Sequence, residues 1–144
     1  MAISRHYENN SSGTVRGPQP MTPFTDEELD YFEKLVLAKK QEALDEIERL
    51  QKYLAQEREE SSNDTAYSFH MADAGTDTMH LENVYIMIER QKTLIGYLDR
   101  ALGRIKNKTY GICRVTGSPI DKERLEAIPH TEITVAAKLQ EQRR

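Results

Sequence analysis

Apolar residues recur at alternating intervals of three and four over residues 25–60, which is the spacing of one face of a long helix. Thr25 is followed three residues later by Glu28, the pattern of a capping box, and the acidic residues 26–28 favour the positive end of the helix dipole. Lys40 interrupts the seam. Its apolar members are Leu29, Phe32, Val36, Ala43, Ile47, Leu50 and Leu54. The pattern predicts a helix about 50 Å long at about 1.5 Å per residue.

A second apolar seam of the same period runs through residues 77–106 and predicts a second long helix. Gln91 interrupts this seam, whose members are Leu81, Val84, Ile88, Ile95, Leu98, Leu102 and Ile105. Between the helices, residues 61–76 lose the period and are rich in Ser, Asn, Asp and Gly, so the chain turns there. Two such helices bury their stripes by folding into an antiparallel hairpin. Heptads also permit pairing between two chains, and we expect the monomeric hairpin.

The two ends of the chain lack the regular apolar spacing of the paired helices. Residues 1–24 are rich in Asn, Ser, Gly and Pro without a period, which predicts a flexible arm. In residues 107–144, glycines and prolines break the chain into short pieces, and Thr131 is expected to cap a final helix. The fold class is therefore all-α: a long antiparallel coiled-coil hairpin, residues 25–106, projecting from a small, mostly helical C-terminal globular module.

Composition narrows the classes of function. Apolar residues make up 38% of the 144 residues. That is below the roughly 45–50% of an average domain and suits long helices with one buried stripe. The net charge of −4 argues against adhesion to nucleic-acid phosphates. The single cysteine, Cys113, excludes an internal disulfide, and neither a secretory segment nor a spanning apolar stretch occurs. We expect a cytoplasmic protein that binds neither DNA nor a membrane.

The segment after the second helix resembles the C-terminal module of the DksA/TraR family. The matching residues are Tyr110, Gly111, Cys113, Gly117, Ile120, Arg124, Leu125, Glu126, Ala127, Pro129 and Lys138. Together with the helical pair, the resemblance covers about residues 25–140. It implies a bacterial transcription regulator of the stringent-response type that inserts its coiled coil into the secondary channel of RNA polymerase.

The family's metal site consists of four cysteines in two CxxC pairs, because tetrahedrally arranged thiolates bind zinc. Here Cys113 stands at the first ligand position, while the other three hold Thr116, Thr134 and Ala137. Neither a hydroxyl nor a methyl group is a competent structural zinc ligand, and His130 would add only one more donor. We therefore expect a degenerate zinc finger that contains no zinc and is held by apolar packing.

In the family, an acidic motif of the type D-x-x-D-x-A lies at the coiled-coil tip and reaches toward the polymerase active centre. Ungapped spacing from the single cysteine aligns its first aspartate with His70, its second with Asp73 and its alanine with Gly75. Asp77 lies one helical turn beyond Asp73 and can supply a second carboxylate. The resemblance implies that the tip rearranges the catalytic loop and the open complex. The alternative is that Asp73, Thr76 and Asp77 only cap the second helix.

Members of the DksA type form, with polymerase, a pocket for guanosine tetraphosphate that is lined by a leucine and basic residues. The matching positions are Leu94, Tyr97, Ile128 and Lys138. Two cations are missing, which argues against alarmone synergy because pyrophosphate binding depends on Arg and Lys. Arg124 is a candidate to compensate.

The leading hypothesis is a regulator, not an enzyme, that binds RNA polymerase rather than DNA and needs no cofactor. The second is a coiled-coil adaptor or scaffold without polymerase contact. The third is a small hydrolase, suggested by histidines and aspartates near the tip, although no catalytic motif accompanies them.

Overall fold

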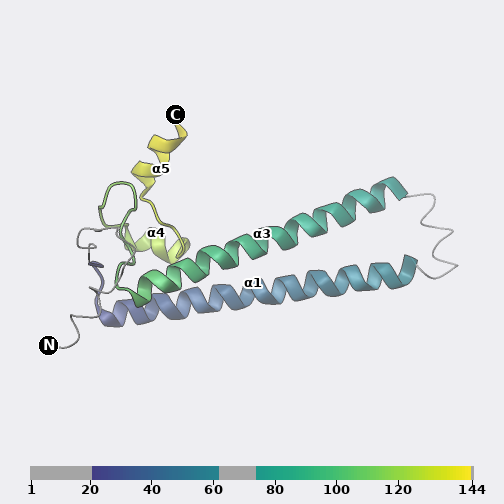
Figure 1. Ribbon diagram of the computed structural model, residues 1–144, viewed down its shortest axis with the longest axis horizontal. Helices are drawn as coiled ribbons and strands as arrows, with labels where there is room; N and C mark the ends of the chain where they lie inside the picture. The colour runs from purple at the N-terminus through teal and green to yellow at the C-terminus, as the bar shows by residue number, and fades with distance from the viewer. Residues whose placement is uncertain (1–20, 62–73, 144) are drawn as a thin grey trace, which may run out of the picture.

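The computed structural model describes residues 21–61 and 74–143. Helix α1 comprises Asp26–Ser61 and helix α3 comprises Ala74–Lys106. The short helices α4, Lys122–Ala127, and α5, Val135–Gln142, follow in the C-terminal module. Figure 1 shows α1 and α3 as a long antiparallel hairpin with the module at one end. The all-α class with a projecting coiled coil is confirmed.

The capping box at the start of α1 forms as the sequence predicts. The Glu28 N–H donates to Thr25 Oγ1 at 3.2 Å, and the Thr25 N–H donates back to Glu28 Oε1 at 3.1 Å. This backbone bond from Thr25 is the main cause that lowers the pKa of the Glu28 carboxyl. Two donors at the helix start are thereby satisfied, which fixes the point where the chain enters the hairpin.

The predicted seams of α1 and α3 face each other along the hairpin. Lys40, which interrupts the first seam, reaches across to Asp99 on α3, with Nζ and Oδ1 2.8 Å apart. Towards the far end, the seam residues Leu50, Val84 and Ile88 form a cluster of their own. The helices therefore stay packed well away from the module. None of the described helices is long and apolar enough to cross a membrane.

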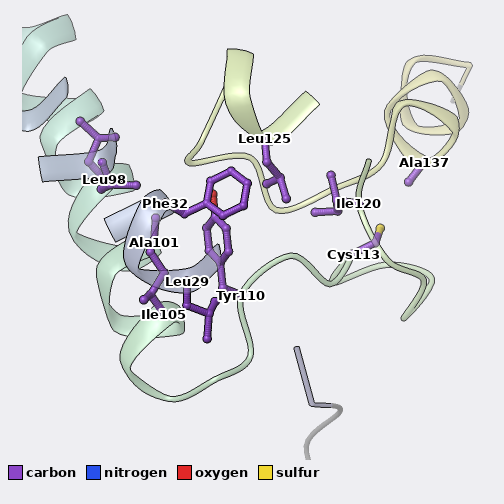
Figure 2. Close-up of a cluster of buried hydrophobic side chains, with 11 residues drawn as sticks. Leu29, Phe32, Leu98, Ala101, Ile105, Tyr110, Cys113, Ile120, Leu125 and Ala137 are labelled. Carbon is purple, nitrogen blue, oxygen red and sulfur yellow. The ribbon is translucent and has the colours of Figure 1, made fainter. Parts of the chain in front are cut away.

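The main core lies where the base of the hairpin meets the module (Figure 2). Phe32 of α1 is fully buried, and its ring centroid lies 5.1 Å from that of Phe24 and 5.2 Å from that of Tyr110. The Tyr110 hydroxyl donates to the Pro129 carbonyl at 2.7 Å, and burial raises the pKa of this phenol. Aromatic rings from three separate segments thus join the hairpin to the module.

Several boundaries differ from the sequence predictions. Residues 22–24, assigned to the arm, contact the core, since Thr22 Oγ1 donates to the Tyr110 carbonyl at 2.6 Å; residues 1–20 lie outside the described part. Helix α3 begins at Ala74, three residues before the expected start at Asp77. The prediction that Thr131 caps the last helix is wrong: Thr134 does so, with Oγ1 accepting from an N–H in the first turn.

Candidate functional site

A tight loop before α4 places the single cysteine in the module. The Cys113 N–H donates to the Ser118 carbonyl at 2.8 Å, and the Cys113 carbonyl accepts from the Gly117 N–H at 2.9 Å. Gly117 has φ of +74° and Gly111 has φ of +86°, a backbone region that favours glycine. A Cβ at position 111 would also overlap the Phe24 ring. Both glycines of the sequence pattern are therefore required by the loop geometry.

The structure brings together the four positions that the sequence analysis aligned with zinc ligands. Thr134 donates to the Cys113 sulfur through its backbone N–H at 3.4 Å and its hydroxyl at 3.9 Å. Its Oγ1 also accepts from the Ala137 N–H at 3.2 Å, and Ala137 is buried. Figure 2 shows Cys113 and Ala137 together at the α5 end of the core. The loop and the start of α5 are thus joined through one sulfur atom.

Several hydrogen-bond donors surround the sulfur of Cys113. Burial raises the pKa of this thiol, but hydrogen bonds from the Thr116 hydroxyl and from the backbone N–H groups of Thr134 and Thr116 outweigh burial and lower the pKa to about 6. Donors that point at a sulfur favour its thiolate form. The site is therefore built around the sulfur as a hydrogen-bond acceptor.

The positions aligned with the effector pocket fall on two sides of one aromatic stack. The Tyr97 ring of α3 lies parallel to the His130 imidazole, with centroids 5.9 Å apart and an interplanar angle of 9°. On one side is a mainly apolar groove of about 520 Å³ that Leu94 lines. On the other is a cavity of about 350 Å³ that Lys138 lines. Arg124 lines neither space, and its Nε donates to the Ile133 carbonyl at 3.0 Å.

A cluster of charges that the sequence analysis did not find holds the module against α3. One carboxylate, that of Glu132, contacts Arg100 at 2.5 Å, Arg104 at 2.9 Å and Arg114 at 3.4 Å. Two of these arginines come from α3 and one from the cysteine loop. Several charge-assisted contacts to one carboxylate attract the segments electrostatically and also fix their relative positions. No local sequence pattern marks Glu132, because its partners lie at least 18 residues away along the chain.

Comparison with known proteins agrees with this architecture. The family profile of the prokaryotic dksA/traR C4-type zinc finger matches residues 108–139. The RNA polymerase-binding transcription factor DksA of Caulobacter vibrioides is 33% identical over 128 residues, covering 88% of this chain and 85% of that protein. The chain belongs to the DksA/TraR family. The solved structure of the transcription factor DksA2 from Pseudomonas aeruginosa matches 81% of this DksA/TraR chain and 84% of its own, with a TM-score of 0.65 and 26% identity. General stress protein 16O of Bacillus subtilis is 41% identical over 68 residues, covering 47% of this chain and 42% of that protein.

The C4-type zinc finger of the DksA/TraR family implies a metal, but the residues present do not fit zinc. A structural zinc site needs four donors, and here the assembled positions offer one thiol, two hydroxyls and a methyl group. No group of three or more His, Cys, Asp or Glu residues in the described ranges could hold a metal ion. Hydrogen bonds to sulfur and the buried Ala137 methyl group connect the two segments instead.

We predict that purified protein contains well under one zinc per chain and that a chelator leaves its unfolding midpoint unchanged. The physical reason is that the free energy of folding comes from packing and hydrogen bonds rather than from metal ligation. Elemental analysis and thermal unfolding with and without EDTA measure this. A stoichiometry near one zinc per chain, with unfolding at lower temperature in EDTA, would contradict it.

The residues that the sequence analysis assigned to the tip lie either at the far end of α3 or outside the described residues. His70 and Asp73 lie outside the described residues. Gly75, Thr76 and Asp77 are in the first turn of α3, whose 33 residues extend about 50 Å from the module at about 1.5 Å per residue. The assigned motif therefore adjoins the end of α3 that is remote from the module.

Proposed function

We propose that this chain binds RNA polymerase and regulates initiation by inserting the tip of the α1–α3 hairpin into the secondary channel. The observation that carries the proposal is a match to an RNA polymerase-binding transcription factor over most of both chains, in a fold with a long projecting hairpin. Two packed helices, each about 10–12 Å wide, form a probe slender enough for a channel.

The activity we assign is binding rather than catalysis, and it does not include DNA. A chain with a net charge of −4 lacks the cationic excess that phosphate-backbone binding requires. The relatives that match most of this chain, DksA of Caulobacter vibrioides and DksA2 of Pseudomonas aeruginosa, are transcription factors. The proposal places the protein in the cytoplasm as a monomer that meets DNA only through polymerase.

The proposed regulation does not depend on guanosine tetraphosphate. Of the residues aligned with the effector pocket, Tyr97 and Ile128 carry no charge, and only Lys138 is a cation. Arg124, the candidate replacement, uses its guanidinium to hold Ile133 and Thr131 in the loop before α5. A pyrophosphate group would therefore meet fewer free cations than this mode of recognition requires.

A binding experiment distinguishes the proposed function from its alternative, a coiled-coil adaptor without polymerase contact. We expect purified chain to bind polymerase core enzyme and to be displaced by a Gre-type factor, which enters the same channel. Retention of the complex at saturating Gre-type factor would place the chain elsewhere on polymerase. Absence of any complex would favour the adaptor.

A variant with a shortened hairpin tests whether regulation depends on the reach of the tip. Deleting residues 51–57 from α1 and 82–88 from α3 removes one heptad from each helix, keeps the seams in phase and shortens the coil by about 10 Å. Because the module and the hairpin base are unchanged, we expect this variant to fold and bind polymerase but to lose its effect on transcription. An unaltered transcriptional effect would show that tip reach is irrelevant. Circular dichroism verifies that the shortened coil remains helical.

A further inference from the structure

An apolar groove on the outer face of α3 is not covered by any other part of the described chain. It has a volume of about 520 Å³, and His130 of the module lines one end of it. Tyr85 and Ile86 line the groove and are each 49% exposed, and Tyr97 is 44% exposed. Large apolar side chains that gather on one exposed face are typical of an interaction site, because a helix face in water is otherwise polar.

The module end of the groove is already ordered. The Tyr97 ring stacks on His130, and the Arg100 guanidinium carbon lies 5.5 Å from the Tyr97 ring centroid. From Tyr97 the groove follows α3 back to Tyr85, a length of about 18 Å at about 1.5 Å per residue. A partner that covers such a preformed surface loses less conformational entropy, and a single helix is long enough to cover it.

Two opposite charges lie at the middle of this groove. Glu89 and Arg90 both line it, and both side chains are exposed. Glu89 Oε1 lies 3.4 Å from Lys92 Nζ on the same helix, whereas Arg90 forms no ion pair with another described residue. The apolar lining continues on both sides of the two charges, with Tyr85 and Ile86 before them and Leu94 and Tyr97 after them. Read in either direction along α3, the lining is therefore apolar, then charged, then apolar again.

We propose that a second copy of this chain docks in the groove, with the two α3 helices antiparallel about a two-fold axis beside Glu89 and Arg90. A two-fold interface uses the same surface of both copies, so that surface has to be self-complementary. In the antiparallel arrangement, Glu89 of each copy faces Arg90 of the other. Four residues further out on either side, Tyr85 of each copy faces Leu94 of the other, so apolar groups cover apolar groups.

Gly96 supports a close approach of two helices at this face. It lies seven residues after Glu89, which is about two helical turns, and so shares its side of α3. A Cβ added at Gly96 would meet no atom of another segment within 4 Å, so packing within the chain does not require a glycine here. Glycine is less favourable than alanine inside a helix, but it lets a second backbone come near.

The expected pairing is weak and reversible. A contact confined to residues 85–97 of each copy should bury less than the roughly 1,200–2,000 Å² of a stable interface, so we expect a dissociation constant on the order of 10–100 μM. Two paired hairpins are wider than one, so the dimer would not fit a channel that accepts a single hairpin, and the monomer would be the form that binds polymerase. Only this consequence rests on the proposed function, because the pairing itself does not involve polymerase.

Sedimentation equilibrium of the full chain without polymerase tests the pairing. We expect a reversible equilibrium between monomer and dimer for the wild type. Arg90→Glu makes the facing charges all acidic and Glu89→Arg makes them all basic, so each variant alone should dimerise at least about 10-fold more weakly. An equal mixture of the two variants should recover the wild-type affinity, because the acidic face of one then meets the basic face of the other.

The matched controls are Lys34→Glu and Glu42→Arg, which make the same kinds of charge change at exposed positions of α1 away from the groove. Both should pair as the wild type does, and circular dichroism verifies that every variant is folded. A wild-type chain that is still monomeric at about 500 μM would overturn the proposal. So would unchanged pairing of Arg90→Glu, or a mixture that pairs no better than the single variants. None of these outcomes bears on polymerase binding, so the proposed function is tested separately.

Discussion

Replacing Phe32 with alanine is expected to lower the free energy of unfolding by about 3–5 kcal/mol. The side chain is fully buried, and it contacts both Phe24, before α1, and Tyr110, in the module. Truncation loses the transfer free energy of a phenyl ring and leaves a cavity that three segments would have to close. Since single domains are stable by about 5–15 kcal/mol in total, this one change removes a large share.

Urea unfolding followed by circular dichroism measures this effect. The matched control is Leu44→Ala on the same helix. Leu44 is 42% exposed, so its truncation should cost well under 1 kcal/mol. A loss below about 1 kcal/mol for Phe32→Ala would mean that the aromatic contacts do not join hairpin and module. In that case the hairpin would not be positioned by the core.

Most of the hairpin could be predicted because its determinants are local and periodic. Heptad spacing places seam residues such as Val36 and Leu98 on one face, and both are buried in the structure. The Thr25–Glu28 capping box is formed within one turn, so sequence neighbours alone specify it. Helix starts without such a signal, such as the start of α3, were predicted less accurately.

The last helix shows why a local signal can fail. Thr131 and Thr134 are both acceptable caps by residue type. In the structure Thr131 Oγ1 donates to the Ile133 carbonyl at 3.2 Å and lies 3.4 Å from a donor of Arg124, which fixes it in the loop. Only Thr134 remains free to accept from the helix. Helix α5 begins at Val135, directly after Thr134, so Thr134 and not Thr131 takes the N-cap position, and sequence spacing does not reveal this.

Only part of the candidate site could likewise be predicted from the sequence. Alignment to the family pattern assigned Cys113 and Thr134 to two ligand positions of one metal site, and the structure places these residues in contact. The stack of Tyr97 on His130 and the arginine cluster on Glu132 depend on how the module docks on α3. Contacts between segments that far apart in sequence carry no periodic signal, so they emerged only from the structure.

Changing Asp73 to lysine is expected to abolish the effect on transcription while leaving polymerase binding and folding intact. Asp73 directly precedes Ala74, the first residue of α3, and ungapped spacing from Cys113 aligns it with the second aspartate of the family motif. A hydrogen bond to a charged group is worth about 1.5–3 kcal/mol, which is a roughly 10- to 150-fold change in the equilibrium it supports. Charge reversal replaces that attraction with repulsion, so the loss should reach at least this range.

The matched control is Glu82→Lys, which makes the same charge change at an exposed position further along α3. It should preserve both binding and regulation, because it lies on the coil rather than at the tip. Circular dichroism and the polymerase-binding assay confirm that both variants are folded and bound. A shared loss of activity would trace to net charge rather than to Asp73.

The most direct measurement is in vitro transcription with purified polymerase, without guanosine tetraphosphate, at a promoter whose output the wild-type chain changes. At saturating protein, we predict that the Asp73→Lys variant leaves transcript yield at the level seen without regulator, whereas Glu82→Lys reproduces the wild-type effect. A wild-type response from folded, polymerase-bound Asp73→Lys protein would contradict the account, because the tip carboxylate would then have no role in the channel.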